Sequence, residues 1–153
     1  MGNKINQSQI KATAPQFVRT VLTSAQIKAL RATPVQIAPA PGAGKMIVPY
    51  LIIFTYHGEG ATPYDVSGGG LMEIKWGTVA APSSVLTITN NLLVSTTDDS
   101  ILPNIGEPLF DYQFINTDLV NKALMLKNNG GAEYEDGTGD ATVTIYYNIV
   151  SVE

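Results

Sequence analysis

The sequence predicts an all-β fold, a β-sandwich or jelly roll with one short N-terminal helix and an extended N-terminal arm. Short apolar segments recur along most of the chain and are separated by Gly, Pro, Asn and Asp, which favour turns. Only one segment spaces its apolar residues as a helix does. The first 16 residues show neither the apolar alternation of a strand nor the apolar spacing of a helix. We therefore expect residues 1–16 to form the arm and residues 17–153 a single β-sandwich domain.

The predicted arm is polar and basic, and the charge along the whole chain is unevenly distributed. Residues 1–58 contain six Lys and Arg and no acid, whereas residues 59–153 contain three Lys and all 13 acids. Such a split suggests that one part of the chain meets an oppositely charged partner. We expect the N-terminal segment to dock on an acidic protein, with Lys4, Lys11 and Arg19 in the interface. The six charges are too dilute for nucleic-acid binding, and no aromatic stacking pattern accompanies them.

The helix is predicted just after the first strand. Thr23 can cap its N-terminus, and Gln26 stands three residues later, as a capping box requires. Ile27 and Leu30 then fall on one helical face. Pro34 prevents a longer helix, so we expect about two turns.

Eight segments are expected to form strands because apolar residues alternate in them or fill them. They are residues 17–22, 35–38, 45–57, 71–76, 85–89, 109–115, 123–127 and 141–152. The intervening residues 39–44, 58–70 and 128–140 are rich in Gly, Pro or Asp and are expected to form turns and loops. Residues 90–107 are expected to form a long connection.

The longest predicted strand, residues 45–57, is apolar on both faces, which is typical of a strand that is buried on both. One face would meet the core and the other would meet the arm, the helix or another subunit. We expect Tyr50, Ile52 and Phe54 to contribute to such an interface, and Pro49 to mark a sheet edge or a bulge. Charged residues make up only 14% of the chain, against roughly 25% in a typical soluble domain. Both observations favour a structural subunit whose surface is covered in an assembly.

Catalytic and cofactor motifs are absent, so the sequence predicts a non-enzymatic protein without cofactors. The absence of cysteine removes disulfides, thiolate metal sites and thiol nucleophiles. His57 is the only histidine, and no Gly-x-Ser-x-Gly elbow occurs with which it could act. Residues 41–45 resemble a phosphate loop, but Pro39 and Met46 stand where that loop needs Gly and Ser or Thr.

The composition of two further segments bears on calcium binding and on membrane association. The acid-rich residues 133–140 make Asp136 and Asp140 weak calcium candidates, although they lack EF-hand spacing and equally suit a β-turn. The longest apolar run, residues 46–54, is too short to span a membrane, and residues 1–10 lack the apolar core of a secretion signal. We therefore expect neither a bound metal nor a membrane partner.

Two parts of the chain, about residues 20–48 and 123–150, resemble small virion proteins of tailed bacteriophages and prophages. The first part contains Leu22-Thr23-Ser24-Ala25-Gln26-Ile27-Lys28-Ala29-Leu30, Thr33-Pro34-Val35-Gln36-Ile37 and Ala40-Pro41-Gly42-Ala43-Gly44-Lys45. The second contains Asn129-Gly130-Gly131-Ala132, Gly137-Thr138-Gly139-Asp140 and Val143-Thr144-Ile145-Tyr146-Tyr147. The basic arm has no counterpart in that pattern.

The resemblance implies a virion structural protein: a capsid-associated, decoration, head-fibre or tail component, made in the host cytoplasm. Such a protein would form homo-oligomers, with a trimer as the first expectation for a capsid ornament. It would also contact the major capsid protein or another virion protein. The alternative is a fibre-tip or adsorption module that binds a host glycan through residues 58–70 and 90–107.

Overall fold

The computed structural model describes residues 11–12, 14–77, 84–101 and 119–152, and these form a mostly β structure with two antiparallel sheets. The strands and helices in chain order are β1 (Lys11–Ala12), β2 (Gln16–Leu22), α1 (Ser24–Lys28), β3 (Val35–Ala38), β4 (Lys45–His57), β5 (Met72–Trp76), β6 (Ser84–Ile88), the 3-10 helix η2 (Asn90–Val94), β7 (Asp99–Ile101), β8 (Leu124–Asn128) and β9 (Asp140–Ser151). The predicted all-β class is confirmed at this level. The predicted strand at 109–115 lies outside the described residues.

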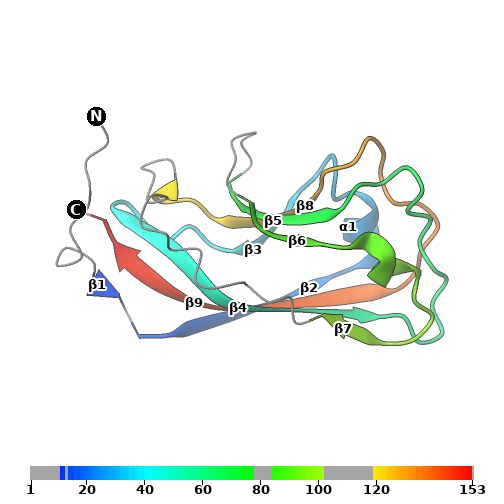
Figure 1. Ribbon diagram of the computed structural model, residues 1–153, viewed down its shortest axis with the longest axis horizontal. Helices are drawn as coiled ribbons and strands as arrows, with labels where there is room; N and C mark the ends of the chain where they lie inside the picture. Colours follow the sequence, from blue (N-terminus) through cyan, green and yellow to red (C-terminus); the bar gives the residue numbers. More distant parts are fainter. Residues whose placement is uncertain (1–10, 13, 78–83, 102–118, 153) are drawn as a thin grey trace.

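The two sheets form two layers, which Figure 1 shows one above the other. One layer has the strand order β1-β9-β4-β7, with β2 also paired to β9, and is called here the five-stranded sheet. The other has the order β3-β8-β5-β6 and is called the four-stranded sheet. Every pairing is antiparallel.

Side chains from both layers meet in the larger of two hydrophobic clusters; the smaller one contains Met46, Val48, Leu119 and Val150. The five-stranded sheet contributes Ile52, Phe54, Val143 and Ile145, and the four-stranded sheet contributes Met72, Ile74, Leu124 and Leu126. Ile27 and Leu30, from α1 and the turn after it, belong to the same cluster and are fully buried. Successive residues of a strand point to opposite faces of a sheet, so each strand can present one apolar face to the other layer. Removal of that apolar surface from water favours its burial.

The predicted capping box forms at the start of α1. The Thr23 hydroxyl accepts a hydrogen bond from the Gln26 backbone N–H at 3.3 Å, and Gln26 Oε1 accepts from the Thr23 backbone N–H at 2.9 Å. The helix itself is shorter than predicted, five residues, and turns follow it. Glu133 holds that turn, because its two carboxylate oxygens accept from the backbone N–H groups of Arg31 and Ala32.

Strand β4 contains the bulge that Pro49 suggested. Pro49 pairs with Tyr147 and Leu51 pairs with Tyr146, which leaves Tyr50 as an extra residue on β4. The edge alternative also fits, because β7 pairs only with Phe54, Thr55 and Tyr56, and among the described residues β4 is paired at Pro49 on its β9 side alone. The extra residue shifts the alternation of side chains by one position.

This shift corrects part of the predicted interface. Ile52 and Phe54 are both fully buried in the core of the chain itself, so neither is available to another subunit. Tyr50 remains 47% exposed. The expectation that β4 is buried on both faces holds for residues 46–49, which are all buried, and fails after the bulge, where Leu51, Ile53 and Thr55 on the outer side are only partly buried.

Two further expectations differ from the structure. Within the predicted arm, Lys11 and Ala12 pair with Ser151 and Val150 of β9, and β2 already begins at Gln16. Residues 1–10, including Lys4, lie outside the described residues. The predicted long connection at 90–107 contains η2 and the short strand β7, which pairs with β4.

Candidate functional site

The face of the five-stranded sheet that points away from the core carries the candidate site. It is called here the outer face and is formed by Phe17, Arg19 and Val21 of β2, Thr142, Thr144 and Tyr146 of β9, and Leu51, Ile53, Thr55 and His57 of β4. These residues alternate along their strands with core residues such as Leu22, Val143, Ile145 and Phe54. None of these ten residues is Lys, Asp or Glu, and the acid on this face, Asp140, stands at its end as the register partner of His57.

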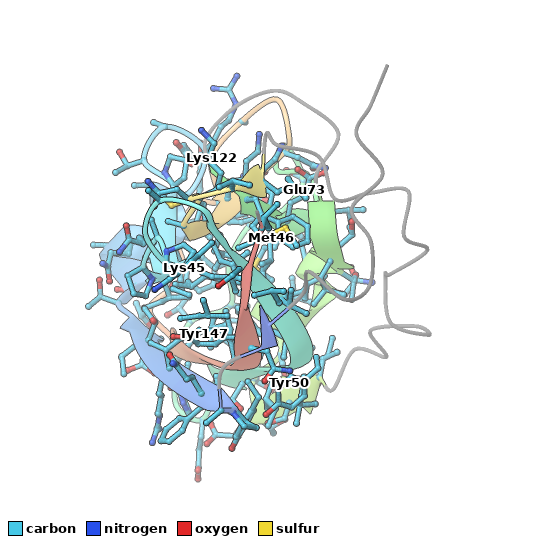
Figure 2. The ribbon with its side chains drawn as sticks, turned by 90° about the vertical axis from the view of Figure 1, so that its left-hand side faces the viewer. Lys45, Met46, Tyr50, Glu73, Lys122 and Tyr147 are labelled. Atoms are coloured by element: carbon cyan, nitrogen blue, oxygen red, sulfur yellow. The ribbon has the colours of Figure 1, made fainter. Side chains whose placement is uncertain are left out.

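Three aromatic rings cross this face from strand to strand. The ring of Tyr146 lies 5.8 Å from that of Phe17 and 6.4 Å from that of Tyr50, centroid to centroid. Phe17 is 68% exposed. In Figure 2, Tyr50 lies at the outer side of the five-stranded sheet, whereas Tyr147 lies between the layers. We call Phe17, Tyr146 and Tyr50 the aromatic row. Contiguous exposed apolar patches are a common feature of binding and interaction surfaces.

A hollow lies beside the aromatic row. It is lined by Phe17, Arg19, Thr55, His57, Thr142, Thr144 and Tyr146. The lining therefore combines two aromatic rings with hydroxyl groups, an imidazole and a guanidinium, groups that can both stack and hydrogen-bond. All of these residues come from β2, β4 and β9, and none comes from residues 58–70 or 90–107, the loops expected to bind a glycan.

His57 is held from both sides in this hollow. Its Nε2 lies 3.2 Å from the Thr142 hydroxyl, and its Nδ1 lies 3.5 Å from Asp98 Oδ2. The backbone N–H of Glu59 donates to Asp98 at 3.1 Å, and this bond, together with the neighbouring His57, holds the pKa of the Asp98 carboxyl below its usual range. Neither Thr142 nor Asp98 was identified from the sequence, because they lie 85 and 41 residues from His57 and share no motif with it.

The order hydroxyl, imidazole, carboxylate is that of a catalytic triad, but the surroundings of Thr142 differ from those of a nucleophile. Thr142 lies within β9 and pairs with Val21 of β2 on one side and Thr55 of β4 on the other. A strand paired on both sides uses its backbone N–H groups in the sheet, so they are not free to stabilise an oxyanion. The two contacts therefore fix the orientation of the imidazole between Thr142 and Asp98.

Opposite ends of the five-stranded sheet carry opposite charges. Lys11 and Lys45 both pair with Ser151 at one end, and Figure 2 shows Lys45 and Lys122 at that end. At the other end stand Asp140, opposite His57 in the β9–β4 register, and Asp99, opposite Tyr56 in the β7–β4 register. Arg19, between the ends, forms no salt bridge within the described part of the chain.

The structure also places the remaining predicted site residues. Asp136 is exposed and adopts a left-handed backbone conformation with φ of 61°, and Asp140 begins β9. In the described ranges, no three His, Asp or Glu side chains come together as a metal site would require. Of the predicted interface residues, Arg19 and Tyr50 lie at the hollow and in the aromatic row, and Lys11 lies on β1.

No protein-family model matches the sequence, and no curated protein matches it. No helix in the described residues is long and apolar enough to cross a membrane. Function is therefore inferred from the outer face and from the order of the strands.

Proposed function

We propose that this chain is a structural subunit of a bacteriophage particle, a jelly-roll β-sandwich that associates with copies of itself and with another virion protein. The strand order carries the proposal. Apart from β1, the first strand pairs with the last, the second with the last but one, and so inward: β2 with β9, β3 with β8, β4 with β7 and β5 with β6. A jelly roll consists of eight strands in two sheets, and nested pairing of eight strands over two sheets supports the proposed jelly-roll fold.

Viral capsid proteins are a frequent use of that arrangement, and lectins are another. The fold alone does not select between them. The outer face favours the structural role, because two rings of the aromatic row, Phe17 and Tyr50, are exposed beside the partly buried Tyr146. A particle subunit buries such a surface on assembly. We expect a homo-oligomer, with a trimer as the first expectation, in contact with the major capsid protein or a neighbouring virion protein.

Docking on the particle is assigned to the N-terminal segment. Removal of residues 1–10 leaves β1 and β2 in their ladders with β9, so we expect the shortened protein to fold with unchanged circular dichroism. We expect it to lose binding to purified particles that lack the full-length protein, measured by co-sedimentation. A matched control replaces residues 1–10 with Gly and Ser at equal length, which separates loss of the Lys4 charge and the other native side chains from loss of length. Normal occupancy of the particles by the shortened protein would show that the anchoring role is wrong.

The hollow supports a second candidate, recognition of a host glycan. Sugars stack on aromatic rings and bond to hydroxyl, imidazole and guanidinium groups, and Phe17, Tyr146, His57 and Arg19 offer these together. If this candidate holds, an array of host surface glycans binds the purified protein, and Tyr146→Ser abolishes the signal. Thr87→Ser, at an exposed position of β6 in the four-stranded sheet, should leave it unchanged. Absence of binding to any glycan at millimolar concentration would dismiss this candidate.

A further inference from the structure

We infer that the outer face of the five-stranded sheet is covered by a second copy of this chain. The inference rests on the proposed self-association and assigns it to one surface. In this inference the aromatic row, Val21 and Arg19 contact the second copy.

The exposed apolar residues of the chain concentrate on this sheet. Among the described residues, Phe17, Val21 and Tyr50 are three of the five large hydrophobic side chains that are strongly exposed. The other two, Leu71 and Val94, lie apart from it, before β5 and at the end of η2. The middle of this face consists of aromatic and aliphatic side chains with threonines and Arg19, and its acids stand at one end, which is the composition found at the centre of protein interfaces.

The charges bordering this face favour a copy of the chain over an unrelated partner. Arg19 has no carboxylate partner in the described residues, while Asp98 and Asp140 stand exposed at one end of the same sheet and Lys45 at the other. A strongly acidic partner would suit Arg19 and Lys45 but would be repelled at the end that carries Asp98 and Asp140. A second copy brings both signs of charge and can therefore complement both.

The absence of cysteine from the sequence gives a clean test. Val21→Cys places one thiol on the outer face, where the native side chain is 57% exposed, and Leu71→Cys places one at a control position that is 42% exposed. We expect a thiol reagent to label Cys at position 21 at least about tenfold more slowly in concentrated than in dilute protein, because association follows mass action. Labelling at position 71 should not change with concentration. Mass is measured in parallel by light scattering.

The outcomes separate the assignment of the surface from the proposed self-association. Concentration-dependent protection at position 21, with an oligomeric mass, supports the inference. An oligomeric mass with equal labelling at both positions overturns it but leaves self-association standing. A monomeric mass at all concentrations overturns both. Protection at position 21 in a monomer also overturns it, because a segment of the same chain would then cover the face.

A pair of substitutions provides an independent check. Phe17→Ser combined with Tyr146→Ser removes two rings of the aromatic row, and we expect the dissociation constant of the oligomer to rise at least about 30-fold. Leu71→Ser is the matched control and should leave it unchanged. Unchanged association of the double variant, with intact circular dichroism, would contradict the inference.

Discussion

Replacing Phe54 with alanine is expected to lower the free energy of unfolding by about 3–5 kcal/mol, because the change leaves a cavity in a close-packed core. Phe54 is fully buried and belongs to the cluster that joins both sheets. The measurement is urea unfolding followed by circular dichroism. It should be repeated at several protein concentrations, since association would itself add stability.

Tyr50→Ala is the matched control for Phe54, on the same strand and of similar size. The Tyr50 side chain is 47% exposed, so we expect Tyr50→Ala to lower the free energy of unfolding by less than about 1 kcal/mol. The pair of variants reports on the bulge, because only the extra residue at position 50 explains why one ring faces the core and the other faces outward. A large loss for Tyr50→Ala and a small one for Phe54→Ala would mean that the register of β4 is wrong.

Asn128→Ala is expected to lower the free energy of unfolding by about 2–4 kcal/mol, because it leaves three backbone groups in a largely buried site without hydrogen-bond partners. The Asn128 side chain is almost fully buried at the end of β8. Its Oδ1 accepts from the backbone N–H groups of Gly70 and Gly130 at 2.9 and 2.7 Å, and its Nδ2 donates to the Ala132 carbonyl at 2.9 Å. One amide therefore joins the loop before β5 to the loop after β8.

The neighbouring residue is the control for Asn128. Asn129 is exposed and its amide makes a single side-chain bond, to Glu73 at 2.9 Å. We expect Asn129→Ala to cost less than about 1 kcal/mol, since its freed partner can bond to water instead. Both variants are compared by urea unfolding under the same conditions. Equal decreases in the free energy of unfolding for the two variants would show that burial of the Asn128 amide does not determine how much it stabilises the fold.

Local signals made much of the fold predictable. The bounds predicted for β3 and β4, residues 35–38 and 45–57, match the structure, because apolar alternation between turns is written in adjacent residues. The capping box of Thr23 and Gln26 was equally visible, since its partners are three residues apart. Short elements without such signals, η2 and β7, were missed.

The candidate site was only partly predictable. Arg19 and Tyr50 were expected in an interface and do lie on or beside the outer face, whereas Ile52 and Phe54 lie in the core. The prediction followed strict alternation through residue 50, and the bulge broke that alternation. The aromatic row joins residues from the two ends and the middle of the chain, so no single window of sequence contains it.

By itself, the sequence determined the class of the fold, its single capped helix and the positions of most strands, because these depend on neighbouring residues. Only the tertiary structure decided which face of each strand is covered, how the strands nest as pairs, and that His57, Thr142 and Asp98 meet. Those features depend on contacts between residues that are tens to more than a hundred positions apart. Pairing between such distant segments follows from the packing of the whole chain, so local patterns leave it open.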